Sequence, residues 1–311
     1  MNFHQLGIFC TVVQRRSFTD AAFDLRLTQP AVSLQVKVLE RELGLPLFER
    51  RGGKLRLTQA GEALYRCATS ILHSKDEAQR AISELAAATK GKLILGANTT
   101  GGMYLLPRIV RVFTEVQPGA EIIFQIESTE WLYQQILQSA VDMALVGGPT
   151  EDRRFGVEPV CVDQVVLIAS PSHPFSRVSK ITLGELEHEP LIVPTHGSRT
   201  RLLVERKLKE AGANVRIAMQ LSGTEAVKKA VEANLGVAFV SQFAIERECS
   251  LDALKVIAVQ SFRLTRHMEL VYRRQKYFSP VARRFQEFIH LYARDHLGPP
   301  NKARFKTVGL K

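Results

Sequence analysis

Apolar positions recur with a helical period along the N-terminal part of the chain. Spacings of three and four residues, which mark one face of a helix, run through residues 3–14, 18–25 and 29–39. This pattern predicts a small bundle of three helices. Thr28 immediately precedes the third segment and is a candidate N-cap, while Pro30 falls in its first turn, where the missing N–H costs little.

The third segment is amphipathic, and its two faces suggest different roles. Val32, Val36 and Leu39 fall on the face toward the predicted core. A polar face after a tight connection is typical of a helix-turn-helix, whose second helix enters the major groove with its N-terminus first. An ordinary amphipathic helix pair shows the same periodicity, so the pattern alone leaves both interpretations open. The candidate DNA-binding residues of this segment are Thr28 and, at base edges, Gln29, Pro30, Ser33 and Leu34.

A short basic turn follows the three helices. Between two strand-like pieces, residues 50–54 read Arg-Arg-Gly-Gly-Lys. This arrangement is a winged version of the motif, and basic wing tips contact phosphates or reach into the minor groove, where the negative potential is strongest. We therefore expect phosphate or minor-groove contacts from Lys37 on the third helix and from Arg50, Arg51 and Lys54 on the wing.

One ordered series of residues in this region carries a family resemblance. It consists of Phe9, Leu25 and Arg50 together with residues 17–19, 21–22, 28–33, 39–40, 43–44, 46–48 and 57–58. In this series the segment resembles the winged helix of the LysR-type transcriptional regulators. The chain departs from the family at residues 15–16, which are both Arg, and at Leu34, where the family often has Arg or His. Leu34 can contact a thymine methyl in place of a guanine edge, which affects the target sequence but not the expectation of DNA binding.

Residues 59–90 predict one long helix, capped by Thr58. Its apolar stripe is thin and rich in small residues, and consists of Ala60, Leu64, Cys67, Ile71, Ala78, Ile82 and Leu85. A lone helix of this kind is not stable in water, so it needs a partner. The family resemblance implies antiparallel pairing with the same helix of a second chain. Packing onto the chain's own second half is the alternative.

From residue 91 the pattern changes to strands that alternate with helices. Strand-like runs lie at residues 93–97, 122–126, 143–146, 165–169, 191–193, 215–220, 237–240 and 268–272. This alternation predicts an α/β domain with parallel sheets. The resemblance implies two Rossmann-like lobes of the periplasmic-binding-protein type. Lobe I would comprise residues 91–161 and 268–297, and lobe II residues 162–267.

The expected domain organisation follows from these segments. A mainly α-helical winged helix-turn-helix domain covers residues 1–58, and a linker helix for dimerisation covers residues 59–90. The two-lobed α/β effector-binding domain covers residues 91–297. Residues 298–311 form a basic tail that we expect to be disordered.

Four connections in the second half are rich in hydroxyl, amide and glycine residues. Ligands of such sheets lie beyond the carboxyl ends of the strands, and free N–H groups at helix N-termini favour an anion. Each loop alone is more typical of ordinary capping. Four loops at one cleft, with Arg199 and Arg201 beside one of them, favour a small carboxylate, phosphate or sulfur oxyanion. The candidate effector-binding residues are Asn98, Thr99, Thr100, Gly101, Ser128, Thr129, Thr195, Ser198, Arg199 and Thr224.

Composition adds weaker constraints. The formal net charge of +11 favours a polyanionic partner. Basic residues are also frequent in the C-terminal part, so the excess charge is not confined to the head. The four cysteines, at positions 10, 67, 161 and 249, lack disulfide or metal-ligand spacing and are expected to be reduced thiols. No secretory signal and no apolar run long enough to cross a bilayer is visible, so we expect a cytoplasmic protein.

The sequence shows no catalytic motif. It has no phosphate-binding P-loop, no nucleophile elbow and no zinc-binding HExxH pattern. Asp142 and Asp163 stand near strand ends, where isolated carboxylates are usually surface or capping residues. We therefore expect no enzymatic activity, no catalytic residue, no metal site and no cofactor beyond a small-molecule effector.

Together these patterns predict a sequence-specific DNA-binding transcriptional regulator controlled by a small anionic metabolite between its two lobes. The expected partners are double-stranded promoter or operator DNA, the metabolite, further copies of the chain in a homodimer or homotetramer, and RNA polymerase. Residues 99–108 are similar to regulators of carbon-fixation and sulfur-assimilation genes. The alternatives are a solute-binding or sequestering protein without DNA affinity, and an enzyme.

Overall fold

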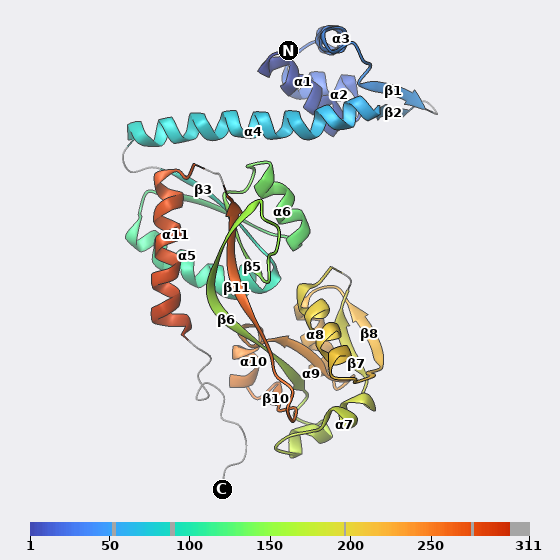
Figure 1. Ribbon diagram of the computed structural model, residues 1–311, viewed down its shortest axis with the longest axis vertical. Helices are drawn as coiled ribbons and strands as arrows, with labels where there is room; N and C mark the ends of the chain where they lie inside the picture. The colour runs from blue at the N-terminus through green and yellow to red at the C-terminus, as the bar shows by residue number, and fades with distance from the viewer. Residues whose placement is uncertain (52–53, 88–90, 196, 275–276, 299–311) are drawn as a thin grey trace. The chain divides into compact units, whose positions relative to one another are not determined.

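A computed structural model describes residues 1–51, 54–87, 91–195, 197–274 and 277–298 (Figure 1). The chain forms two compact units, one made mainly of residues 1–83 and the other mainly of residues 84–298. The expected wing tip at Gly52 and Gly53, and the expected tail after Gly298, lie outside the described residues.

The first unit starts with three short helices. They are α1 (Phe3–Arg15), α2 (Phe18–Leu25) and α3 (Gln29–Leu43). Arg16 and Arg26 take left-handed conformations that end α1 and α2, which allows the tight connections between the helices. Val32, Val36 and Leu39 of α3 are buried, as the periodicity predicts.

Thr28 occupies the N-cap position of α3, but its side chain accepts no capping hydrogen bond. Pro30 removes the N–H of the second helical position, and the N–H of the third position, Ala31, is not bonded by the Thr28 side chain either.

The wing consists of two antiparallel strands, β1 (Phe48–Arg51) and β2 (Lys54–Leu57). The carboxylate of Glu40 on α3 accepts hydrogen bonds from the backbone N–H groups of Leu47, at 2.7 Å, and Phe48, at 3.3 Å. The Phe48 ring also packs against the rings of Phe9 and Phe18, with centroid distances of 5.4 and 5.5 Å. These contacts fix the base of the wing relative to α3.

The helix α4 (Gln59–Ala87) begins where Thr58 accepts a 3.0 Å hydrogen bond from the N–H of Gly61. The apolar stripe predicted for this helix divides into two faces. One face, with Ala60 and Leu64, packs into the core of the first unit together with Ala68 and Leu72, which the predicted stripe did not include. The other face is exposed, and includes Cys67, Ile71 and Ile82.

Gly61 is the point where α4 lies directly against the base of the wing. A Cβ atom at this position would lie 2.1 Å from the carbonyl oxygen of Leu47 and 2.8 Å from the Leu57 side chain. Because a backbone carbonyl cannot give way cheaply, Gly61→Ala is expected to destabilise the first unit by about 1–3 kcal/mol. Denaturant unfolding of the full-length chain measures this change.

The matched control is Gly7→Ala in α1, because nothing lies within 4 Å of a Cβ atom there. This variant should gain up to about 1 kcal/mol, since alanine favours the helix more than glycine does. A Gly61→Ala protein as stable as the wild type would contradict the close packing of α4 on the wing.

The second unit is built on two long antiparallel strands that run through both of its lobes, β6 (Phe155–Ala169) and β11 (Leu264–Arg273) (Figure 1). In lobe I, three parallel strands continue the sheet beyond β11. They are β5 (Met143–Gly147), β3 (Lys92–Ala97) and β4 (Glu121–Ile126). The helical segments of lobe I are η1 (Gly101–Leu105), α5 (Leu106–Val116), α6 (Thr129–Leu137), α11 (Pro280–Tyr292) and η4 (Ala293–Leu297).

Lobe II adds two short strands to the other end of β6 and contains a separate two-stranded sheet. The strands β9 (Ala238–Ser241) and β10 (Lys255–Ile257) pair with β6, and β7 (Leu191–Pro194) pairs in parallel with β8 (Ile217–Leu221). Its helical segments are η2 (Pro174–Arg177), α7 (Leu183–Glu187), α8 (Arg199–Glu210), α9 (Thr224–Glu232), η3 (Gln242–Ala244) and α10 (Glu246–Ser250). Each lobe has its own buried apolar clusters.

The strand β6 is much longer than the predicted strand at residues 165–169. Its first part carries polar residues and Pro159, which interrupt the apolar pattern. Partners across the fold satisfy these polar groups. Glu158 accepts hydrogen bonds from the Tyr272 hydroxyl and the Gln286 amide, both at 2.6 Å, and Asp163 pairs with Arg266 directly opposite on β11.

Candidate functional site

The exposed face of α3 presents the side chains expected to meet DNA bases. Gln29 and Pro30 are exposed, Ser33 is half-buried, and Leu34 is 57% exposed. The Gln29 amide nitrogen donates a 2.8 Å hydrogen bond to the Ser33 hydroxyl oxygen. The amide oxygen of Gln29 and the hydroxyl hydrogen of Ser33 therefore stay available to a base edge.

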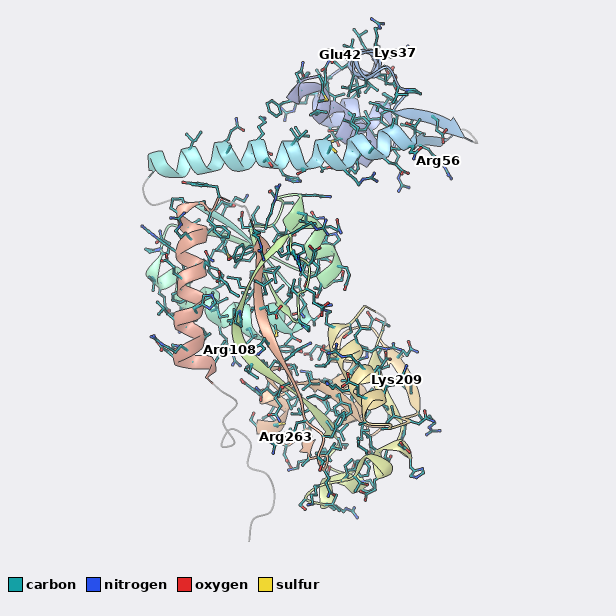
Figure 2. The ribbon with its side chains drawn as sticks, viewed as in Figure 1. Lys37, Glu42, Arg56, Arg108, Lys209 and Arg263 are labelled. Atoms are coloured by element: carbon teal, nitrogen blue, oxygen red, sulfur yellow. The ribbon has the colours of Figure 1, made fainter. Side chains whose placement is uncertain are left out.

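A broad groove of about 1470 Å³ lies between α3, the start of α2 and the wing. Lys37 and Arg56 both line it and are exposed, and Figure 2 shows them on α3 and β2 of the first unit. The sequence interpretation missed Arg56, although it alternates with Leu55 and Leu57 and must therefore face away from them. The side chains of Arg50, Arg51 and Lys54 lie outside the described residues.

A second hollow, a cleft of about 280 Å³, lies between the two lobes of the second unit. It opens at the carboxyl ends of β3, β4, β7 and β8, where η1, α6, α8 and α9 begin. Nine of the candidate effector residues line it, namely Asn98, Thr99, Thr100, Ser128, Thr129, Thr195, Ser198, Arg199 and Thr224. Gly101 does not line the cleft, because it packs against β5, where a Cβ would lie 2.7 Å from the carbonyl oxygen of Leu145.

Three lining residues do act as ordinary helix caps. Asn98 accepts from the N–H of Gly101 at 3.0 Å, Ser128 from that of Trp131 at 3.2 Å, and Ser198 from that of Arg201 at 3.4 Å. The N-cap of α9 is a glycine and provides no side-chain oxygen. The first N–H groups of α9 therefore have no side-chain cap at the cleft, where an anion would be favoured.

The Thr129 hydroxyl is the most unusual polar group at the cleft. Thr129 is 2% exposed, and its Oγ1 atom has no hydrogen-bond partner among the described residues. A buried hydroxyl without a partner costs about 1–3 kcal/mol. Such a group is normally satisfied by water or by a ligand.

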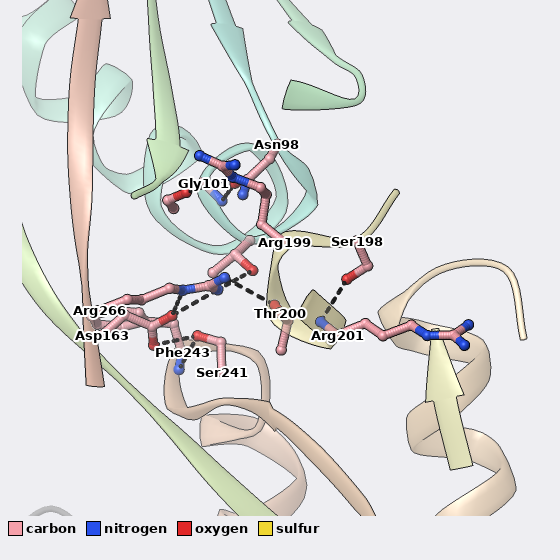
Figure 3. A network of polar contacts seen from close by, with 12 residues as sticks. Asn98, Gly101, Asp163, Ser198, Arg199, Thr200, Arg201, Ser241, Phe243 and Arg266 are labelled. Carbon is pink, nitrogen blue, oxygen red and sulfur yellow. Dashed lines mark hydrogen bonds and ion pairs between the residues drawn. The ribbon is translucent and has the colours of Figure 1, made fainter. Parts of the chain in front are cut away.

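The two arginines at the start of α8 take different directions (Figure 3). Arg199 reaches across to lobe I, where it donates to the carbonyl oxygens of Pro149, at 2.6 Å, and Gly147, at 3.4 Å. Arg201 is buried within lobe II and donates to Glu205, at 2.6 Å, and to Gln220, at 3.0 Å. Of the two arginines beside this loop, Arg199 lines the cleft and Arg201 does not.

Behind the cleft lies a buried ion pair that the sequence interpretation did not foresee. The Nη2 atom of Arg266 lies 2.9 Å from Oδ2 of Asp163, and both side chains are at most 2% exposed. Asp163 also accepts a 2.6 Å hydrogen bond from the Ser241 hydroxyl. The expectation of a surface or capping role for Asp163 is wrong, because a partner in a distant part of the chain makes its burial possible (Figure 3).

The same guanidinium contacts two threonines that line the cleft. Its Nη1 atom donates to the Thr200 hydroxyl at 3.0 Å, and its Nη2 atom donates to the Thr100 hydroxyl at 3.3 Å. Thr200 and Arg266 were both missed in the sequence. Asp163 and Arg266 lie in strands with several other polar residues, so neither charge stands out in the sequence.

The described residues offer little other chemistry. No group of three or more His, Cys, Asp or Glu side chains there could hold a metal ion. Burial raises the pKa of the Cys10 and Cys249 thiols to about 11 and that of Cys161 to about 12, which keeps them protonated at neutral pH. None of the helices in the described ranges has both the length and the apolar character to cross a membrane.

A helical head with an exposed reading helix and a wing, followed by two lobes around a polar cleft, defines a DNA-binding regulator with an effector domain. Residues 3–62 match the family of bacterial regulatory helix-turn-helix proteins of the LysR type, and residues 86–293 match the LysR substrate binding domain. The chain belongs to the LysR family of transcriptional regulators, as the winged-helix residues predicted.

The chain is similar over most of its length to regulators of known name. The transcriptional activator CmpR of Synechocystis sp. is 34% identical over 286 residues, covering 92% of this chain and 94% of CmpR. The RuBisCO operon transcriptional regulator of Allochromatium vinosum is 35% identical over 289 residues, covering 93% and 95%. These names are consistent with the expected similarity to carbon-fixation regulators. They also speak against the enzyme and the stand-alone solute-binding protein.

Solved structures share the fold. CbnR, a LysR family regulator, superposes with a TM-score of 0.72 at 21% identity and covers 94% of this chain and 99% of its own. The regulatory domain of CcmR from Synechocystis PCC6803, in complex with 2-PG, gives a TM-score of 0.63 at 25% identity. It covers 67% of this chain and 99% of its own. The predicted fold class, a helix-turn-helix head before a two-lobed α/β domain, is confirmed.

Proposed function

We propose that this regulator responds to a small anion, a carboxylate or a phosphate ester of central metabolism, bound between its two lobes. The observation that carries the proposal is the unpartnered Thr129 hydroxyl, buried where helix N-termini from both lobes meet. A bound oxyanion would accept from this hydroxyl and from the uncapped first turn of α9. The 2-PG complex of the CcmR regulatory domain supports an anion of this class.

Arg199 would couple the anion to the arrangement of the lobes. Its guanidinium donates hydrogen bonds to two carbonyl oxygens of lobe I. An anion competes well for a guanidinium, because a charge-assisted hydrogen bond is stronger than a bond to a neutral carbonyl. The effector would thereby favour one lobe arrangement over another, which is the condition for any ligand-driven switch.

On the DNA side, we assign base contacts to Gln29, Pro30, Ser33 and Leu34, with Thr28 at the start of the helix. Contacts to phosphates or the minor groove are assigned to Lys37, Arg50, Arg51 and Lys54, with Arg56 added from the groove. We propose residues 1–58 as the DNA-binding domain, 59–90 as the linker and 91–297 as the effector domain.

The exposed stripe on α4 supports self-association. Ile71 is 38% exposed and Ile82 is 69% exposed, on a helix face whose period suits a second helix. We propose that a second copy of the chain covers this face, giving dimers that can join into tetramers. Promoter DNA and RNA polymerase would be the partners of this assembly, in the cytoplasm.

Thr129→Val tests the effector site through two quantities, the stability of the protein and its affinity for anions. Valine keeps the shape but removes the unpartnered hydroxyl, so the ligand-free protein should be as stable as the wild type or slightly more so. Affinity for 2-PG and for inorganic phosphate should fall about tenfold, because one donor to the anion is lost. Titration calorimetry and thermal unfolding of the full-length chain measure the two effects.

Thr114→Val is the matched control, because the Thr114 hydroxyl donates to Arg111 on the outer side of α5, away from the cleft lining. It should leave anion affinity unchanged. Equal affinity of the wild type and Thr129→Val would remove Thr129 from the site. If the wild type binds neither anion saturably, the proposal of an anionic effector fails.

A further inference from the structure

We propose that Arg266 is a positioning residue that presents two threonine hydroxyls, one from each lobe, as hydrogen-bond donors to the bound anion. The residues are Thr100, at the start of η1 in lobe I, and Thr200, at the start of α8 in lobe II. The inference rests on the function proposed above and adds the element that would orient its donors.

The direction of the hydrogen bonds carries the argument. A guanidinium has only donors, so both threonine oxygens must accept from Arg266. Each hydroxyl hydrogen is then left to point elsewhere, and no acceptor for either one lies among the described residues. Because both threonines line the cleft, an oxyanion there is the natural acceptor. A hydroxyl that accepts from a cation also becomes a stronger donor.

The position of Arg266 suits this role better than direct binding. Arg266 does not line the cleft, and its charge is matched by Asp163 at 2.9 Å. The ion pair joins the two long strands that run through both lobes, so the guanidinium belongs to neither lobe alone. Its contribution to anion binding is therefore the placement of two hydroxyls and not a free positive charge.

The Arg266 guanidinium is closely packed. A Cβ atom at Gly147, the last residue of β5, would lie 2.8 Å from Nη1 of Arg266. The planar fork thus fills a gap that the glycine leaves, and it reaches Thr100, Thr200 and Asp163 at once (Figure 3). Lysine, with one charged nitrogen in place of a fork, keeps the charge but cannot hold all three partners in this geometry.

Arg266→Lys therefore separates positioning from charge. In full-length protein, its affinity for 2-PG and inorganic phosphate should fall about tenfold. Thr100→Val and Thr200→Val should each weaken binding about tenfold in the wild type, but by less than about threefold when lysine stands at 266, because the hydroxyls are then no longer oriented. This coupling, measured by titration calorimetry, is a readout that a purely structural role would not produce.

Arg201→Lys is the matched control. Arg201 is as deeply buried and uses its fork in the same way, but its partners Glu205, Gln220 and Pro194 lie within lobe II and none is a cleft hydroxyl. This variant should lose stability and keep its affinity for both anions. A similar loss of affinity in both variants would overturn the proposal, because it would show that any buried arginine in the domain has the same effect.

The remaining outcomes are also decisive. If the wild type and Arg266→Lys bind the anions equally well, the positioning role is wrong, but the proposal of an anionic effector is still supported. If the wild type binds neither anion, both fall. If Arg266→Lys does not fold, the neutral pair Asp163→Asn with Arg266→Gln replaces it, because it leaves no unpaired buried charge. Undiminished affinity of that pair, or an undiminished effect of Thr100→Val within it, overturns the proposal.

Discussion

Replacing Gln29 and Ser33 together by alanine is expected to lower specific DNA affinity about 100-fold and to leave non-specific binding almost unchanged. Each good base contact contributes about 1–3 kcal/mol of discrimination, whereas phosphate contacts carry the non-specific part. The two side chains are hydrogen-bonded to each other at 2.8 Å, so the single variants should each cost more than half of the double variant. Gel shifts with DNA from upstream of the encoding gene, with and without competitor DNA, measure both affinities.

Lys37→Ala is the contrasting variant, because Lys37 is exposed on the same helix and is assigned to phosphate. It should weaken specific and non-specific binding alike and reduce the salt dependence of binding by about one ion. If the double alanine variant keeps its sequence preference, α3 is not the reading helix.

Asp163→Ala is expected to have the largest effect on stability. It would leave the Arg266 guanidinium buried without the carboxylate that lies 2.9 Å away. Breaking a buried pair by removing one partner costs about 3–5 kcal/mol, because an uncompensated charge stays behind. Calorimetric unfolding of the full-length chain should show the transition of the second unit at a clearly lower temperature.

The neutral pair Asp163→Asn with Arg266→Gln should recover most of this loss, since both charges are removed together. The head should be unaffected in either variant, so binding to non-specific DNA provides an internal check of folding. An Asp163→Ala protein with wild-type stability would mean that water reaches the guanidinium, and that the pair is not buried in solution.

The head was predictable because its signals are local. Helical spacing, the cap at Thr58 and the basic wing can each be identified within a few residues. The faces of α3 follow directly from this spacing, and Val32, Val36 and Leu39 are indeed buried. Thr28 takes the predicted N-cap position of α3, but its side chain accepts no capping hydrogen bond.

The second unit was predictable in its loops but not in its polar interior. Strand–loop–helix connections identified nine residues of the cleft, because helix starts have a recognisable composition. The ion pair of Arg266 with Asp163 joins residues 103 positions apart, and no local pattern reports such a contact. The place of Arg201 inside lobe II could not be predicted for a related reason. Its place in the sequence does not reveal that Glu205 and Gln220 hold it inside lobe II.

The bond between Gln29 and Ser33 has a consequence for how quickly the head can recognise its site. Immobilising a long polar side chain at an interface costs about 0.5–1.5 kcal/mol in lost rotamer freedom. In the free head the Gln29 side chain is already held by its neighbour one helical turn away. Part of the ordering therefore precedes the encounter with DNA, so the reading surface meets each new stretch of duplex in a preorganised state.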